Sequence, residues 1–185
     1  MVIRKNHIPK CLIIHLLYNL EPETDTIELP RSSVIHIPVL YGGDYGPDLQ
    51  EVADTNNLSP EEVVNIHSAA PYLVYVLGFT PGFCYLGGMD QRIATPRKLT
   101  PRLKIPAGAV GIADRQTGIY PIESPGGWQL IGQTPVRLFN PGKKPEFLIE
   151  AGDYIQFFPI SEDNFNDISE GVKKGVYLVK KSQEP

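Results

Sequence analysis

Few residues of this sequence have the types and spacing that catalysis requires. The four histidines are scattered and form no metal-ligand spacing, and no serine lies in the Gly-x-Ser-x-Gly pattern of a nucleophile elbow. The sequence also lacks the Gly-x-Gly-x-x-Gly dinucleotide loop and the Gly-Lys-Ser/Thr phosphate loop. What remains is one histidine, one cysteine and a set of neutral groups suited to recognition.

His67 is the candidate acid–base residue. It lies at the end of a predicted helix, 60–67, which a capping box between Ser59 and Glu62 introduces. The histidine shares a face with Val63, so it should point inward. Two interpretations stay open: a histidine that orients or protonates a ligand, and a core histidine bonded to a backbone carbonyl.

The stretch 78–88, which reads GFTPGFCYLGG, combines four glycines and one proline with Phe79, Phe83 and Tyr85. Glycine allows backbone conformations that other residues avoid, and proline restricts them. Large aromatic side chains are costly on an open surface loop. We therefore predict a rigid, apolar-walled turn at the mouth of a cavity. The alternative is a tight turn whose aromatic side chains fill a barrel end.

Cys84 lies inside this stretch and has two interpretations. It could be a nucleophile with His67 as its base, or a small buried hydrophobic residue. The other cysteine, Cys11, is far away in the sequence, so the pair predicts neither a disulfide framework nor a metal site. Two unpaired cysteines fit a reducing cytoplasm.

Amides and hydroxyls in the second half of the chain supply neutral hydrogen-bonding groups. They are Gln116, Thr117, Tyr120, Gln129, Gln133 and Thr134. Beside an apolar pocket, such groups suit a small uncharged or amide-bearing ligand.

The composition excludes several classes of protein. A net charge of −4 and a pI near 5.6 give no reason to expect nucleic acid or an anionic membrane as a partner. No apolar run approaches ~18 residues, so no transmembrane helix is expected. The 185 residues, with 42% hydrophobic and 21% charged residues, are ordinary for a soluble domain with a sizeable core. We expect a cytoplasmic protein.

The elements predict a mainly β fold, a closed β-barrel with two short helices. Glycine and proline are frequent and spread among short apolar runs, which favours many short strands and turns. The predicted helices are 47–54 and 60–67, with a further surface helix at 163–174. The predicted strands are 34–40, 72–77, 103–105, 109–113, 118–122, 128–131, 136–139, 147–150, 154–158 and 175–179. Within the predicted barrel segment the helices occur only near its N-terminal end, which argues against an alternating α/β sheet.

Several long motifs resemble one family. They are YGGDYGPDL (41–49), LSPEEVVNIHS (58–68), GFTPGFCYLGGMD (78–90), ATPRKLTPRLKIPAGAVGIADRQTGIYP (94–121) and ESPGGWQLIGQTPVRLF (123–139). In this order they resemble the family of the 5-oxoprolinase B subunit, also called KipI-like or allophanate hydrolase subunit 1, over about 37–160. The resemblance implies a cyclophilin-like β-barrel.

The resemblance also implies a function. The chain would be a subunit of a bacterial, heteromeric, ATP-dependent 5-oxoprolinase, a hydrolase that converts 5-oxoproline to glutamate. Its partners would be subunits A and C, one of them KipA-like. ATP would be used by the complex, because this chain carries no nucleotide motif, and the chain is not expected to be active alone. One alternative is a KipI-like inhibitor of a sensor histidine kinase, and another is a peptidyl-prolyl isomerase.

The chain departs from the family pattern at its N-terminal end. Family members carry a small α/β domain before the barrel, and the residues that precede the first strand here are too few for one. We therefore expect an N-terminal arm or the remnant of a truncated front domain at 1–33. The barrel domain should follow at 34–160, and a C-terminal extension at 161–185.

These observations predict one pocket in the matching segments, with His67 at its floor. The catalytic residues would be His67, Gln116 and Tyr85, with His67 orienting or protonating the ligand and the other two giving neutral hydrogen bonds. The substrate-binding residues would be Phe79, Pro81, Gly82, Gly118, Tyr120 and Gln129. No metal is expected.

Overall fold

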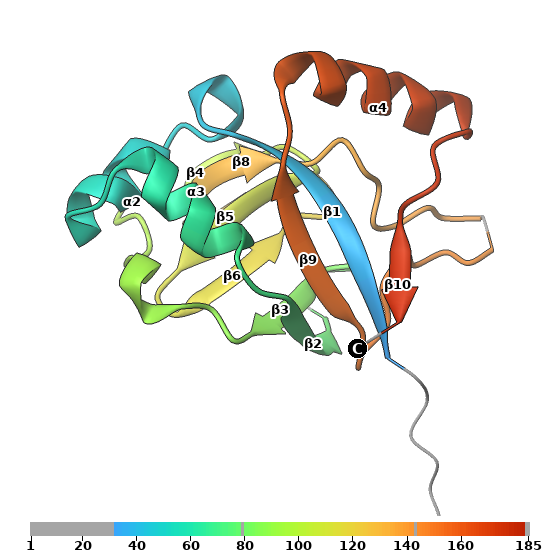
Figure 1. Ribbon diagram of the computed structural model, residues 1–185, viewed down its shortest axis with the longest axis horizontal. Coiled ribbons are helices and arrows are strands. Elements are labelled where there is room, and N and C mark those ends of the chain that lie inside the picture. Colours follow the sequence, from blue (N-terminus) through green and yellow to red (C-terminus); the bar gives the residue numbers. More distant parts are fainter. Residues whose placement is uncertain (1–31, 79, 143, 184–185) are drawn as a thin grey trace, which may run out of the picture. The chain divides into compact units, whose positions relative to one another are not determined.

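Short strands dominate the part of the chain that the computed structural model describes, which is residues 32–78, 80–142 and 144–183. Within these residues an eight-stranded sheet runs in the order β3-β2-β9-β1-β8-β5-β6, with β10 paired to β1 (Figure 1). Its strands are β1 (Ser33–Tyr41), β2 (Tyr72–Leu77), β3 (Cys84–Gly87), β5 (Ala109–Ala113), β6 (Gln116–Ile119), β8 (Gln129–Gln133), β9 (Tyr154–Pro159) and β10 (Lys181–Gln183). A separate two-stranded ribbon consists of β4 (Arg102–Ile105) and β7 (Ser124–Gly126).

The sheet is nearly closed into a barrel because its two end strands, β3 and β6, contact each other. Gly118 in β6 lies close to Cys84 in β3, because a side chain at Gly118 would approach the Cys84 carbonyl to 3.4 Å. Among the described residues β3 and β6 are not paired by backbone hydrogen bonds, so the barrel is completed only by packing of these two strands against each other. The prediction of a mainly β, barrel-like fold is confirmed.

β1 is the strand around which the sheet changes from parallel to antiparallel pairing. It pairs in parallel with β9 from Val34 to Val39, and antiparallel with β10 and β8 at its two ends. The His36 N–H donates to the Lys180 carbonyl, on the side of β10. Because alternate residues of a strand direct their N–H groups to the same side, Pro38 places its missing donor in the gap between β10 and β8. Pro38 therefore occupies a local edge of an otherwise central strand.

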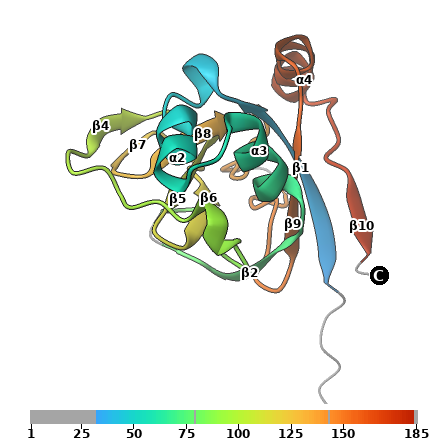
Figure 2. The same ribbon diagram turned by 60° about the vertical axis from the view of Figure 1, so that its left-hand side comes forward.

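The two predicted front helices are present as α2 (Leu49–Asn56) and α3 (Pro60–Ser68). Both bonds of the predicted capping box are formed: the Ser59 hydroxyl accepts from the Glu62 N–H at 3.1 Å, and the Glu62 carboxylate accepts from the Ser59 N–H at 2.7 Å. The helices lie side by side, with α2 packed on β8 and α3 on β9 (Figure 2). They cover the face of the barrel on which β8 and β9 lie.

The C-terminal segment contributes a helix and a strand. α4 (Glu162–Lys174) confirms the predicted surface helix, and none of its residues is buried. The predicted last strand at 175–179 is wrong, because pairing with β1 begins only at Lys181. No helix among the described residues has the length and apolar character needed to cross a lipid bilayer.

Two further predicted strands, 136–139 and 147–150, are not strands. They meet only at an isolated bridge between Phe139 and Phe147, whose rings stack with centroids 5.1 Å apart. Pro135 and Pro141 flank the first segment and cannot donate to a ladder. Apolar alternation in this region therefore reflects burial of side chains without regular pairing.

Buried side chains fall into two clusters. The larger one fills the barrel and includes Ile35, Ile37, Ile155 and Phe157, all fully buried. The smaller one lies beside the β4–β7 ribbon. Its members are Phe83, Ile105, Ala109, Ala113, Tyr120, Trp128 and Leu130. The smaller cluster is rich in aromatic rings and forms the base of the candidate site.

Candidate functional site

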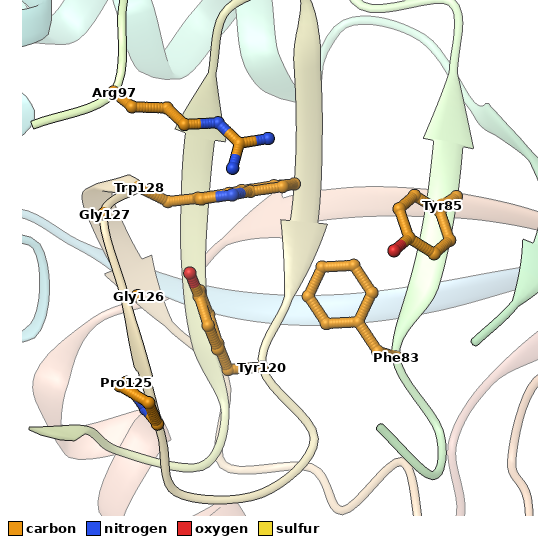
Figure 3. A pocket seen from close by; sticks show the side chains of 8 residues that line it. All are labelled: Phe83, Tyr85, Arg97, Tyr120, Pro125, Gly126, Gly127 and Trp128. Carbon is orange, nitrogen blue, oxygen red and sulfur yellow. The ribbon is translucent and has the colours of Figure 1, made fainter. Parts of the chain in front are cut away.

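A pocket of about 140 Å³ opens above the smaller core cluster. Four segments line it: the start of β3, the chain before β4, the residue that follows β6, and the stretch from β7 to β8. Its residues are Phe83, Tyr85, Arg97, Tyr120, Pro125, Gly126, Gly127 and Trp128 (Figure 3). We call this set the aromatic pocket.

The rings of the aromatic pocket hold one another in edge-to-face contacts. Phe83 is central, with its centroid 5.2 Å from Tyr85, 5.8 Å from Tyr120 and 5.7 Å from Trp128. Tyr120 and Trp128 also meet edge to face at 6.1 Å. Such pairs stabilise by about 0.5–1.5 kcal/mol beyond the area they bury. The base of the pocket is therefore a preorganised apolar surface.

Gly126 lets the pocket wall approach these rings closely. A side chain at Gly126 would clash with the Tyr120 hydroxyl and lie 2.9 Å from the Ile105 methyl group. Burial raises the pKa of Tyr120, against the opposing effects of Arg97 and of the Trp128 backbone. The phenol is therefore protonated at neutral pH and fixed in place.

Arg97 is the only charged residue that lines the pocket within the described part of the chain. Its guanidinium carbon lies 5.9 Å from the centroid of the Trp128 ring, and Figure 3 shows the group extended over the indole. Its Nε is 3.5 Å from Oδ2 of Asp114, and 57% of its side chain is exposed. The pocket thus combines an apolar base with a positively charged rim.

Backbone contacts on both sides fix the position of Arg97. Thr95 and Asp114 exchange two backbone hydrogen bonds, at 2.8 and 3.2 Å, and the Lys98 N–H donates to the Gly127 carbonyl at 2.7 Å. An extended segment directs successive side chains to opposite sides. Arg97 therefore lies over Trp128 while the Lys98 side chain turns away from the pocket.

Lys98 joins an ionic cluster around the buried carboxylate of Asp48. The Asp48 carboxylate accepts from Lys98 at 3.0 Å, from Arg102 at 2.7 Å and from the Leu130 N–H at 2.7 Å. Burial acts to raise the pKa of Asp48, but these hydrogen bonds outweigh it and lower the pKa below its usual value. The cluster ties the segment that carries Arg97 to the N-terminus of α2.

The structure places His67 in the barrel core and not at the floor of the aromatic pocket. Its ring is fully buried, with Nδ1 2.8 Å from the Tyr41 hydroxyl and Nε2 2.7 Å from the Thr117 hydroxyl. It also stacks on Phe157, with centroids 4.6 Å apart. Burial lowers the pKa of His67 to about 3. Both ring nitrogens are occupied within the chain, so its catalytic role stays a prediction that this geometry does not favour.

The other predicted site residues lie in several environments. Tyr85 and Tyr120 are brought together in the aromatic pocket. Pro81 and Gly82 line a separate groove of about 330 Å³ with Phe147. One shared pocket is therefore not what the structure shows, and Phe79 lies outside the described residues.

Three more predicted residues support the pocket or lie beside it. Gly118 leaves room for the Trp128 ring, which a side chain there would approach to 3.2 Å. Gln129 is buried and donates to the Glu51 carboxylate at 3.1 Å and to the Pro96 carbonyl at 3.0 Å. Gln116 is exposed at the start of β6. Their binding and catalytic roles stay predictions.

The alternative of Cys84 as a nucleophile finds no support. The thiol is fully buried, and burial raises its pKa to about 12. A protonated, inaccessible thiol cannot attack a substrate.

Sequence reasoning missed Arg97, Trp128 and the Gly126–Gly127 wall. Arg97 lies in a stretch with several other cations, so its residue type gave no local signal. A usable signal was the pair of glycines directly before the only tryptophan of the chain. Such a pair permits close approach to a large ring.

Comparisons with known proteins place the chain in a described family. The family model "Carboxyltransferase domain, subdomain C and D" matches residues 3–149. The chain is 58% identical to the 5-oxoprolinase B subunit of Bacillus subtilis (strain 168) over 137 residues, which cover 74% of this chain and 57% of that protein. It is 49% identical to the 5-oxoprolinase B subunit of Escherichia coli O157:H7 over 140 residues, covering 76% and 64%. The chain thus spans less than two thirds of these curated relatives.

Solved structures support the same fold. The conserved uncharacterized protein PH0987 from Pyrococcus horikoshii is 52% identical, with a TM-score of 0.70 over 84% of this chain and 68% of that chain. The Kluyveromyces lactis urea amidolyase, at 21% identity, has a TM-score of 0.74 over 96% of this chain and 12% of that chain. The second likeness concerns the fold alone.

Proposed function

We propose, because the chain belongs to the family of the 5-oxoprolinase B subunit, that it acts in an ATP-dependent 5-oxoprolinase complex and contributes to the substrate pocket. The observation that supports this is the high identity to two proteins of that name over most of this chain. The complex would hydrolyse the lactam amide of 5-oxoproline to give glutamate. We infer that it works in the cytoplasm, where ATP is available.

The part of this reaction that the chain can perform is binding and orientation. The aromatic pocket is small, concave and mostly apolar, as sites for small molecules are. Phe83, Tyr120 and Trp128 line the pocket with aromatic surface, against which a five-membered ring can pack with exclusion of water. The Tyr85 hydroxyl lines the same pocket and can bond a neutral lactam group.

ATP does not fit the aromatic pocket. A volume of about 140 Å³ and a single arginine cannot hold a nucleotide with three phosphate groups. The sequence also carries no phosphate-binding loop. The ATP site, and with it the energy coupling, would therefore belong to partner subunits, which we propose to be subunits A and C. Neither of the two curated relatives above is described as a kinase regulator, so the kinase alternative gains no support.

Reconstitution tests this proposal. The full chain, purified alone, should not hydrolyse 5-oxoproline in the presence of ATP, and the complex with subunits A and C should do so. Leaving this chain out of the mixture should abolish glutamate formation, measured by a coupled enzyme assay. Robust hydrolysis by the isolated chain, or unchanged hydrolysis without it, would contradict the proposal.

A further inference from the structure

We propose that the aromatic pocket is a carboxylate-binding site, in which Arg97 pairs with the carboxylate of a small cyclic acid whose ring lies among the aromatic side chains. The identity of the acid, 5-oxoproline, rests on the proposed function. The binding site itself does not, because all of its groups belong to this chain. The neutral groups of the sequence predicted an uncharged or amide-bearing ligand, and the proposal keeps the amide and adds a carboxylate.

The charge of the rim selects an anion. Arg97 is the only charged side chain among the described lining residues, and its contact with Asp114 uses Nε. The terminal nitrogens, which carry most of the N–H groups, form no hydrogen bond within the described part of the chain. A guanidinium offers its N–H groups as a planar fork that matches a carboxylate. Stacking over Trp128 keeps that fork at the pocket edge.

The surroundings favour a carboxylate over a phosphate. Asp114 already neutralises part of the Arg97 charge, so the attraction that remains is too small to offset the larger desolvation cost of a dianion. Phosphate sites in proteins gather several cations or backbone N–H groups. The turn that lines this pocket supplies Pro125, which has no N–H, and Arg97 is the only cation among the described lining residues.

The walls favour a small ring. The pocket holds about 140 Å³ between aromatic faces and a glycine wall that admits no side chain at Gly126. The Tyr85 hydroxyl has no hydrogen-bond partner among the described residues, and Figure 3 shows that hydroxyl on the side facing the other pocket rings. It can donate to a carbonyl or accept from an N–H. A carboxylate, a short ring and a lactam amide would each find a matching group.

Trp128 provides a direct test, because it is the only tryptophan and it lines the pocket. We would titrate the full chain with 5-oxoproline and follow tryptophan fluorescence. 2-Pyrrolidinone has the same ring without the carboxylate, and inorganic phosphate is an anion without the ring. We expect saturable binding of 5-oxoproline, and at least about tenfold weaker binding of 2-pyrrolidinone, because a charged hydrogen bond is lost. Inorganic phosphate should also bind more weakly than 5-oxoproline.

Variants assign the effect to Arg97. R97Q should weaken 5-oxoproline binding by about tenfold or more while leaving 2-pyrrolidinone binding unchanged. R97K keeps the charge without the fork and should give an intermediate loss. R115Q is the matched control, because Arg115 is an exposed arginine of the neighbouring turn that does not line the pocket. Circular dichroism would check that each variant is folded.

Each outcome decides the proposal. Equal affinity for 2-pyrrolidinone and 5-oxoproline, equal loss in R97Q and R115Q, tighter binding of phosphate, or no binding by the isolated chain would overturn it. Binding through Arg97 in a chain whose complex lacks hydrolase activity would leave the site standing and refute the proposed function. If the complex hydrolyses 5-oxoproline and R97Q has no effect on its KM, the proposed function would stand and the carboxylate site would be refuted.

Discussion

At the scale of single residues, His67 fitted both a catalytic and a structural interpretation until its neighbours were known. Its inward direction followed from its helix position. Its partners did not, because Tyr41 and Thr117 come from distant parts of the chain. With both nitrogens bonded inside the barrel, the imidazole joins β1, α3 and β6. The expected role is therefore structural.

Substitution of His67 by alanine separates the two interpretations. We expect His67→Ala to lower the free energy of unfolding by roughly 1–3 kcal/mol, because the Tyr41 and Thr117 hydroxyls lose a buried partner. Turnover of the reconstituted complex should stay near that of the unchanged protein when measured well below the melting temperature. A loss of ~10²–10⁴ in turnover with an unchanged melting temperature would instead establish acid–base catalysis.

The pH dependence of stability gives a second test of His67. Its pKa is lowered from 6.5 to about 3 in the folded chain, so between these values the unfolded state binds more protons. Stability contributed by neutral His67 is therefore complete above pH 6.5 and is lost as the pH falls toward 3. His36, whose pKa is also lowered by burial and by Lys180, contributes in the same direction.

The difference between two proteins isolates the His67 effect. We expect the free energy of unfolding, measured with denaturant, to fall as the pH is lowered from about 6.5 to about 4. The fall should be steeper for the unchanged chain than for His67→Gln, which keeps His36. The extra slope should be at most about 1.4 kcal/mol per pH unit, the value for one proton. Parallel pH profiles for the two proteins would show that His67 can be protonated while folded.

At the scale of elements, the local signals of the sequence were reliable where the element is stabilised locally. The capping box at Ser59 and Glu62 placed α3 correctly, since both of its bonds are within one helical turn. The apolar segment 136–139 failed as a strand, because pairing depends on a distant partner that flanking prolines do not permit. Hydrophobic patterning predicts which side chains are buried. Whether the buried segment also forms a strand depends on a second segment that can pair with it.

The candidate site was less predictable for the same reason. Tyr85 and Tyr120 were expected in one pocket and lie in one. Arg97 reaches Trp128 only because the Thr95–Asp114 bridge and the Lys98–Gly127 bond bring two loops together. No spacing within the sequence encodes that contact. The neutral groups predicted an uncharged or amide-bearing ligand, but the positive charge of the pocket rim was not predicted.

The turn between β7 and β8 offers a matched pair of glycine substitutions. Gly126→Ala places a methyl group against the Tyr120 hydroxyl and Ile105, and Tyr120 cannot move easily because it packs on Phe83 and Trp128. We expect a loss of about 1–3 kcal/mol in unfolding free energy, measured by denaturant titration, and a changed tryptophan emission.

Gly127→Ala is the control for that substitution. Its added methyl group would meet only ordinary contacts, the nearest being the Lys98 carbonyl at 3.4 Å. We expect its melting temperature to stay within about 2 °C of the unchanged protein, as for a loss of at most ~0.5 kcal/mol. Equal destabilisation by both substitutions would mean that the turn as a whole, and not the approach of Gly126 to Tyr120, demands glycine.

At the scale of the whole molecule, the described chain separates into a barrel that forms the aromatic pocket and a C-terminal segment that lines none of it. α4 buries no residue, but Tyr177 and Val179 pack on the main core and β10 covers one edge of β1. The segment 161–185 should therefore stabilise the barrel without shaping the pocket. The expected boundary after residue 160 can be tested on this basis.

Truncation after Ile160 should leave a folded barrel that melts at a lower temperature. The Ile160 N–H still donates to the Val39 carbonyl, so the β1–β9 pairing stays intact. Removing β10 uncovers the edge of β1 from Ser33 to Ile35, and an uncovered edge invites pairing between chains. We therefore expect unchanged tryptophan emission together with concentration-dependent dimers in analytical ultracentrifugation. An unfolded truncated chain would show instead that 161–185 is an integral part of the domain, because its packing would then be required for the barrel to form.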